Sequence, residues 1–267
     1  MSNHNPIGVF DSGLGGLTVV KELLNVLPHE SIIYFGDTAR VPYGTKSKET
    51  IIRFSQENTK VLLKYRVKMV VVACNSCSSY ALGHLRKMFR VPIVGVIEPG
   101  ASKAVYSTRN NKVGIIATQA TIRSDQYPQT IKQFQKDITI FSKACPLFVP
   151  LVEEGWLDKK VTVDVAQEYL AELKSKDIDT LILGCTHYPL LKNILHQVMG
   201  NKVTLIDSAQ VVALEVKRLL QQLKIECDNN TKPKHQFLIS DRPQEFKRIA
   251  SKFLGRPIKK VDLIAED

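Results

Sequence analysis

Two stretches of this sequence decide its fold: Met69-Val70-Val71-Val72-Ala73-Cys74-Asn75-Ser76 and Leu181-Ile182-Leu183-Gly184-Cys185-Thr186-His187. Each is an apolar run that ends at a cysteine and continues with polar residues. Such a run is typical of a strand buried in a parallel sheet, and the polar residues after it favour the start of a helix. In open α/β sheets, ligands bind at the carboxyl ends of the strands. Both thiols are therefore expected at ligand-binding edges.

Further apolar segments extend this pattern along the whole chain, and helical patterns lie between most of them. Alternation of strands and helices predicts an α/β fold with parallel sheets. The predicted strands are Ile7–Phe10, Ile32–Gly36, Met69–Ala73, Ile93–Ile97, Val113–Ala117, Ile138–Phe141, Thr180–Leu183, Val203–Ile206 and His235–Ile239. Helical patterns include Thr18–Leu27, Lys48–Tyr65, Ser78–Phe89, Val161–Lys174 and Ser208–Leu223.

The chain also contains an internal repeat. Ile7-Gly8-Val9-Phe10-Asp11-Ser12 resembles Val113-Gly114-Ile115-Ile116-Ala117-Thr118, an offset of 113 − 7 = 106 residues, and the two cysteine segments are offset by 185 − 74 = 111 residues. Two matched pairs at nearly one offset predict two similar α/β domains. We expect the first to comprise 1–97 plus 208–267 and the second 98–207, with a crossing at Glu98-Pro99-Gly100. A cleft between two such domains would set the thiols opposite each other.

Composition limits the classes of function. The chain has 267 residues, 44% hydrophobic and 24% charged, which is ordinary for a globular protein. It shows neither a signal-peptide pattern nor an apolar stretch of about 20 residues, so a membrane protein is not expected. Five cysteines, an odd number, favour a reducing, cytoplasmic setting over a disulfide framework. The net charge is +11, but the basic residues are scattered, which disfavours a nucleic-acid partner.

The two cysteines are the leading catalytic candidates. A single buried cysteine is more often an apolar filler. Here both thiols precede a helix start, where backbone N–H groups and the helix dipole favour thiolate. His187 follows Cys185 closely enough to assist it. Asp11 begins the glycine-rich stretch Asp11-Ser12-Gly13-Leu14-Gly15-Gly16 and could direct a proton or simply cap a helix. That stretch does not fit the dinucleotide fingerprint, because Thr18 stands where its last glycine should be.

The second thiol of Cys74-Asn75-Ser76-Cys77 leaves two alternatives open. One is a dithiol redox site of the C-x-x-C type. The other is a metal site with Cys74, Cys77, Cys185 and His187 as ligands. The remaining cysteines, Cys145 and Cys227, are assigned to packing.

Four motifs taken together resemble those of one enzyme family. They are Gly8-Val9-Phe10-Asp11-Ser12-Gly13-Leu14-Gly15-Gly16-Leu17-Thr18-Val19, Gly36-Asp37-Thr38-Ala39-Arg40-Val41-Pro42-Tyr43-Gly44, Ala73-Cys74-Asn75-Ser76 and Gly184-Cys185-Thr186-His187-Tyr188-Pro189-Leu190. In this order they closely resemble the glutamate racemases, and the similarity runs from Ile7 to the C-terminal Phe253-Leu254-Gly255. A racemase for aspartate or another amino acid is the nearest rival.

The resemblance implies an isomerase that interconverts L- and D-glutamate without a cofactor or metal and supplies D-glutamate for peptidoglycan. It also implies two α/β domains with the site between them, and a homodimer. Cys74 would take the proton from D-glutamate and Cys185 from L-glutamate, with help from Asp11, His187 and Glu153. The expected substrate contacts are Asp11, Ser12, Tyr43, Gly44, Asn75, Ser76, Thr118, Thr186 and His187.

The chain departs from the family pattern at one place. After Cys74-Asn75 the family usually has threonine and alanine, whereas this sequence has Ser76 and Cys77. Serine keeps the hydroxyl group. Cys77 adds a second thiol near the catalytic one, which predicts that oxidants inactivate the enzyme through a Cys74–Cys77 disulfide.

Overall fold

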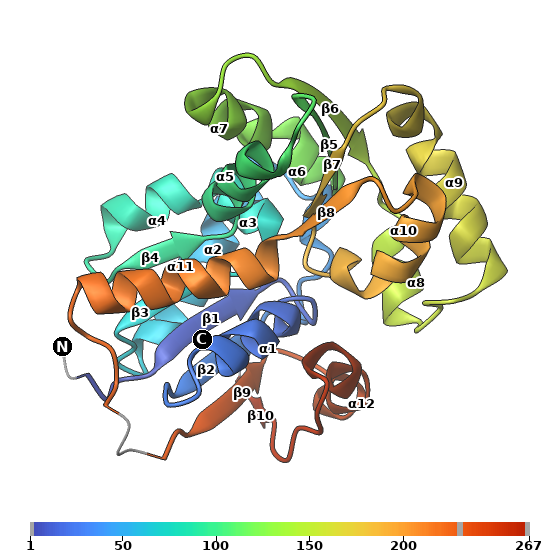
Figure 1. Cartoon of the computed structure of the whole chain (residues 1–267). Coiled ribbons are helices and arrows are strands. Elements are labelled where there is room, and N and C mark those ends of the chain that lie inside the picture. Colours follow the sequence, from blue (N-terminus) through green and yellow to red (C-terminus); the bar gives the residue numbers. More distant parts are fainter. Residues whose placement is uncertain (1–2, 229–231, 265–267) are drawn as a thin grey trace.

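The computed structural model describes residues 3–228 and 232–264 of the chain. They form two sheets in which every pair of neighbouring strands is parallel. The first sheet has the strand order β10-β9-β2-β1-β3-β4. Its strands are β1 (Ile7–Asp11), β2 (Ile32–Gly36), β3 (Met69–Val72), β4 (Ile93–Gly95), β9 (His235–Ile239) and β10 (Asp262–Leu263). Figure 1 shows β9, from the end of the chain, beside the early strand β2, with β10 on the other side of β9.

The second sheet repeats the central order of the first. It runs β6-β5-β7-β8, matching β2-β1-β3-β4 strand for strand. The internal repeat in the sequence therefore has a structural counterpart, with β1 equivalent to β5 and β3 equivalent to β7. The strands of this sheet are β5 (Lys112–Ala117), β6 (Thr139–Ala144), β7 (Thr180–Gly184) and β8 (Thr204–Asp207). The expected fold class, parallel sheets flanked by helices, is confirmed.

Helices flank both sheets (Figure 1). Strands β1, β3 and β7 are buried along their whole length, which is why their sequences are continuously apolar rather than alternating. The helices are α1 (Leu17–Val26), α2 (Lys48–Leu63), α3 (Asn75–Tyr80), α4 (Leu82–Met88), α5 (Ile97–Ser107), α6 (Gln119–Arg123), α7 (Gln126–Phe134), α8 (Phe148–Glu153), α9 (Lys160–Ser175), α10 (Lys192–Met199), α11 (Ser208–Gln222) and α12 (Pro243–Leu254), with short 3-10 turns η1 (Tyr43–Thr45) and η2 (Tyr188–Leu191).

The structure adds detail to the sequence-based expectations at three places. The single helix predicted over Ser78–Phe89 is divided at Ala81 into α3 and α4. Glu98-Pro99-Gly100, where a crossing between the domains is expected, lies in the first turn of α5, where proline is tolerated because its missing N–H would have no helical partner. Strand β10 was not predicted, because two residues are too few to show a periodic pattern.

The two-domain division, 1–97 plus 208–267 against 98–207, stays a proposal. In its favour, the strands of the first sheet all fall in the first range and those of the second sheet in the other. Polar contacts join the two parts: Thr18 Oγ1 donates to the Thr186 carbonyl oxygen at 3.1 Å. The Ser76 and Thr118 hydroxyl oxygens are 2.9 Å apart.

A buried ion pair lies at the start of β3, an interior strand of the first sheet. Lys68, immediately before β3, is fully buried, and its Nζ lies 2.8 Å and 2.7 Å from the two carboxylate oxygens of Glu30. The same ammonium group donates to the backbone carbonyl oxygens of Asn3 and Ile225, each at 2.7 Å. One charge thus connects three segments that are distant in sequence.

Among the described helices, none is long and apolar enough to span a membrane.

Candidate active site

The two cysteines open into one cavity. Cys74 is the N-cap residue of α3, two residues after the end of β3, and Cys185 directly follows the equivalent strand β7. Both line a cavity of about 340 Å³ and each is 6% exposed. Because the two strands belong to different sheets, the thiols reach this cavity from the two halves of the molecule. The other expected site residues on the cavity wall are Ser12, Tyr43, Gly44, Asn75, Ser76, Thr118, Glu153, Thr186 and His187.

Cys185 lies at one end of a relay of ionisable groups. Its Sγ is 3.8 Å from Nδ1 of His187, and Nε2 of the same ring is 2.9 Å from Oε1 of Glu153. Burial disfavours a charged imidazole, but the hydrogen bonds with Cys185 and Glu153 outweigh it and raise the pKa of His187 to about 10. At neutral pH the ring is therefore an imidazolium that can donate to both partners.

Tertiary packing creates this relay. Glu153 is the last residue of α8, and His187 immediately precedes η2. The His187 ring also packs edge-on against Phe253 of α12, with ring centroids 5.4 Å apart. Sequence analysis missed Phe253 as a site residue, since an apolar residue in an amphipathic helix carries no signal of what it will touch.

Asp11 lies beneath the cavity rather than on its wall. Its carboxylate is fully buried at the end of β1 and accepts a hydrogen bond from the Gly13 N–H at 3.0 Å. The Thr186 hydroxyl lies 3.4 Å from its other oxygen. Burial raises the pKa of Asp11, while the charge of His187 and backbone hydrogen bonds oppose that rise. Asp11 is thus connected to both the glycine-rich loop and the Cys185 segment.

Close packing explains two glycines at this junction. A Cβ atom on Gly15 would lie 2.1 Å from Thr186 Oγ1 and 2.6 Å from His187 Nδ1. A Cβ atom on Gly44 would lie 2.8 Å from the Thr118 side chain. Both glycines therefore allow a loop of the first half to approach site residues of the second half.

Tyr43 belongs to the wall, but its hydroxyl group is already engaged. The residue is 1% exposed, and its hydroxyl makes a short hydrogen bond to the buried Asp37 carboxylate. Burial and the nearby negative groups raise the pKa of Tyr43, so the phenol stays neutral. Tyr43 and Gly44 can therefore offer a ligand their backbone rather than the phenol.

The polar residues after Cys74 are held by the opposite half of the molecule. Tyr127 of α7 donates to Asn75 Oδ1 at 2.8 Å, and Ser76 Oγ lies within 3.3 Å of the Thr121 hydroxyl. Within the described residues, Nδ2 of Asn75 has no hydrogen-bond partner, which leaves a donor for a ligand. Sequence analysis missed Tyr127 and Thr121, because their partners lie 52 and 45 residues away.

The metal-site alternative lacks geometric support. Among the described residues, no three of Cys74, Cys77, Cys185 and His187 come together as a potential metal-binding group; a surface group of His4, Cys227 and Asp228 does. All five cysteines are free thiols, so the dithiol alternative stays untested.

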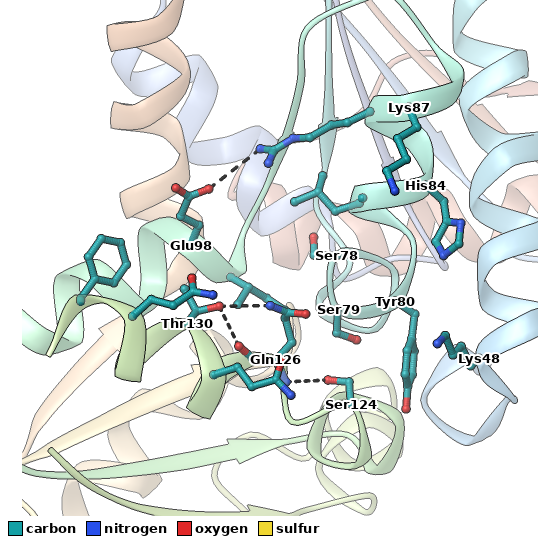
Figure 2. Close-up of a pocket in the computed structure, with 17 residues that line it drawn as sticks. Lys48, Ser78, Ser79, Tyr80, His84, Lys87, Glu98, Ser124, Gln126 and Thr130 are labelled. Atoms are coloured by element: carbon teal, nitrogen blue, oxygen red, sulfur yellow. Dashed lines mark hydrogen bonds and ion pairs between the residues drawn. The ribbon is translucent and has the colours of Figure 1, made fainter. Parts of the chain in front are cut away.

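A second cavity, of about 730 Å³, borders α3 on its other side. Its lining comes from α2, α3, α4, α5 and α7 and includes the polar and basic side chains of Lys48, His84, Lys87 and Gln126 (Figure 2). No cysteine lines it. Of these two cavities, only the one of about 340 Å³ has two thiols on its wall. We therefore assign the candidate active site to that cavity.

The chain is similar to known amino-acid racemases. Residues 7–216 match the family profile of Asp/Glu/Hydantoin racemase. A glutamate racemase of Geobacter metallireducens is 48% identical over 249 residues, which are 93% of this chain and 92% of that protein. A crystal structure of a glutamate racemase isoform from Bacillus anthracis superposes with a TM-score of 0.95 at 40% identity, covering 98% of each chain. A glutamate racemase of Francisella tularensis in complex with D-glutamate has a TM-score of 0.93 and 38% identity, again covering 98% of each chain.

Proposed function

Because the chain belongs to the Asp/Glu/hydantoin racemase family, we propose that it interconverts L-glutamate and D-glutamate by proton transfer between two cysteines at the α-carbon. One observation carries this proposal: Cys74 and Cys185 end equivalent strands of two similar sheets and line one cavity. Inversion at carbon requires removal of a proton from one face and delivery to the other. Two thiols that reach one space from opposite halves of the protein suit that requirement.

Each direction starts from a different protonation state. With D-glutamate bound, the Cys74 thiolate removes the α-proton and the Cys185 thiol delivers its proton to the opposite face. With L-glutamate the roles reverse. Each passage leaves the pair in the state that serves the other enantiomer, so no proton donor besides the two thiols is needed.

The α-proton is very weakly acidic, so the developing negative charge must be stabilised. Fixed donors around the substrate carboxylate supply such stabilisation without reorganising during the reaction. Asn75 Nδ2, the hydroxyl groups of Ser12 and Thr186, and the backbone of Gly44 are suited to this task. The proposed reaction proceeds on these groups without a cofactor.

His187 and Glu153 are the proposed assistants of Cys185. An imidazolium 3.8 Å from the sulfur stabilises the Cys185 thiolate, the form that removes the α-proton of L-glutamate. Glu153 keeps the ring charged and oriented through its 2.9 Å contact. Asp11, beneath the cavity, is proposed to position Thr186 and balance the imidazolium charge rather than to touch the substrate.

The testing experiment follows the α-proton of D- or L-glutamate by proton NMR in D2O, with chelator-treated enzyme and no added cofactor. We expect the α-proton signal to disappear as the opposite enantiomer forms. Cys74→Ala and Cys185→Ala should each abolish racemisation, whereas the control Cys227→Ala, outside the cavity, should retain it. If aspartate exchanged its α-proton and glutamate did not, the assignment of glutamate as the substrate would be refuted. Full activity in either cysteine variant would refute the two-cysteine mechanism.

Three wider features belong to the same proposal. The D-glutamate product is proposed to supply peptidoglycan synthesis in the cytoplasm, so a bacterium lacking this enzyme and any substitute should need external D-glutamate to grow. The working form is proposed to be a homodimer, and its mass in solution can be measured by sedimentation. The proposed partner is the small-molecule substrate, with neither membrane nor nucleic acid required.

A further inference from the structure

A cluster of three potential metal ligands lies away from the candidate active site. It comprises His4, three residues before β1, together with Cys227 and Asp228 on the chain that leaves α11. One ligand atom from each side chain (a nitrogen, a sulfur and a carboxylate oxygen) lies within 4.8 Å of the other two. None of these three described residues lines the cavity that holds Cys74 and Cys185. The proposed racemisation therefore does not use this cluster.

The side chains of the cluster have a spacing that suits a small metal ion. Sγ of Cys227 is 3.5 Å from Nδ1 of His4, and a carboxylate oxygen of Asp228 is 3.9 Å from Nε2 of the same ring. A tetrahedral zinc ion, about 2.3 Å from sulfur and about 2.0 Å from nitrogen, holds those two atoms about 3.5 Å apart. The sulfur and the nitrogen therefore lie at the separation that zinc requires. Asp228 directly follows Cys227 and its side chain is exposed, so a small rotation brings one of its oxygens to a third position.

The backbone on both sides of the cluster is fixed by the buried ion pair of Lys68 and Glu30. The Lys68 ammonium group donates to the carbonyl oxygens of Asn3 and Ile225, each at 2.7 Å. The Glu30 carboxylate accepts a hydrogen bond from the Cys227 N–H at 2.8 Å. Figure 1 shows the segment before β1 beside the chain that leaves α11. Because both segments share one buried anchor, little conformational entropy remains to be lost when an ion binds.

The types of donor atom indicate which ion would bind. Thiolate sulfur and imidazole nitrogen are preferred ligands of Zn²⁺, whereas Ca²⁺ and Mg²⁺ take oxygen ligands. A Cys227 thiolate and an Asp228 carboxylate together carry two negative charges, which balance the charge of the ion, and the neutral His4 ring adds none. Three protein ligands leave the fourth tetrahedral position to water. Binding releases the Cys227 proton to solvent, because the thiolate is the ligand.

Exposure separates Cys227 from the other cysteines. Sequence analysis assigned Cys227 to packing, yet it alone among the five cysteines is not buried. An ion can therefore reach its sulfur from solvent without opening the fold.

We propose that His4, Cys227 and Asp228 bind one Zn²⁺ ion, which clamps the segment before β1 to the connection between α11 and β9. The ion joins residues as far as 223 positions apart in the sequence. The site is a structural one, because an unfolded chain does not offer the three ligands together and the binding free energy therefore favours the folded state.

The test titrates Zn²⁺ into chelator-treated, full-length protein by isothermal titration calorimetry, without glutamate. The wild type should bind the ion at a site that depends on its ligands. His4→Ala and Cys227→Ala should each weaken binding at least about a hundredfold, because changes to groups that only orient a metal ligand already cost about 10–100-fold. Two controls should bind like the wild type: His84→Ala, which removes an exposed histidine elsewhere, and Cys74→Ala, which removes a thiol of the candidate active site.

Two further measurements identify the ligand and its effect on stability. Co²⁺ in place of Zn²⁺ should give a thiolate-to-metal charge-transfer absorption in the wild type that is missing in Cys227→Ala. Zn²⁺ should raise the Tm of the wild type and leave that of Cys227→Ala at its metal-free value.

Two results would overturn the proposal. If the wild type bound no Zn²⁺, the three side chains would form only a hydrogen-bonded cluster at the surface. If His4→Ala and Cys227→Ala bound the ion as tightly as the wild type, or Cys74→Ala alone lost it, the ion would lie elsewhere. Binding is measured without turnover, so the outcome is independent of the racemase assay.

Discussion

Replacing Glu153 by glutamine should lower the upper pH limit of activity. The carboxylate lies 2.9 Å from Nε2 of His187, whose side chain is 7% exposed, while that of Glu153 is 38% exposed. Two unit charges at this separation attract by about 1.4 kcal/mol in bulk water and by about 6 kcal/mol at an effective dielectric constant of 20. Because Glu153 is partly in solvent, we take a value near the lower limit, about 1.4 kcal/mol, or about one pKa unit of His187.

The assay is the pH dependence of kcat/KM. In the wild type, activity should decline as His187 loses its proton near its pKa of about 10. Glutamine keeps the size of the side chain and a possible hydrogen bond but removes the charge, so the alkaline limb of Glu153→Gln should lie about one unit lower. Direct titration of the His187 ring by NMR should show the same displacement.

The neighbouring residue provides a matched control. Glu154 is exposed, and Glu154→Gln removes an identical charge one position further along the chain. Its alkaline limb should coincide with that of the wild type. An unchanged limb in Glu153→Gln, or an equal displacement in both variants, would refute the assignment of Glu153 as the group that keeps His187 charged.

The same pKa predicts how folding stability depends on pH. His187 binds its proton more tightly when folded, with a pKa of about 10 against the ordinary histidine value of 6.5. Its contribution to stability is therefore complete below about pH 6.5 and is lost as the pH rises toward 10. In Glu153→Gln the folded-state pKa is lower, so this loss should end about one unit earlier. Urea unfolding across this pH range measures the difference.

Three further perturbations have defined outcomes. Gly15→Ala places a methyl group against Thr186. The variant should still fold but lose at least about tenfold in kcat/KM, because small displacements of site residues have large kinetic effects. A near-wild-type rate would contradict the packing at this junction. Hydrogen peroxide should inactivate the enzyme by forming a Cys74–Cys77 disulfide, and dithiothreitol should reverse the loss. Each disulfide forms as one molecule of hydrogen peroxide is reduced to two molecules of water. Equally fast inactivation of Cys77→Ala would exclude this route. Lys68→Met leaves its glutamate partner buried without a counter-charge and should lower the free energy of unfolding by about 3–5 kcal/mol in urea denaturation, whereas a loss below about 1 kcal/mol would show that the pair contributes little.

The local sequence determined the elements that carry the thiols. A run such as Met69–Val72 is apolar on both faces, which is typical of a strand covered on both sides in a parallel sheet. The polar residues after Cys74 and Cys185 mark the carboxyl ends of the strands, where ligands bind in such sheets. The repeat of the two cysteine segments also predicted equivalent strands. These inferences succeeded because strand burial and helix starts depend on neighbours only a few residues away.

Tertiary structure decided how the site groups meet. The Glu153–His187 contact spans 34 residues, and the Thr186–Asp11 contact spans 175. Whether such residues meet depends on how helices pack and how the two sheets face each other, which no local period encodes. The sequence could suggest Asp11 as a site residue, but only packing placed it beneath the cavity instead of on its wall.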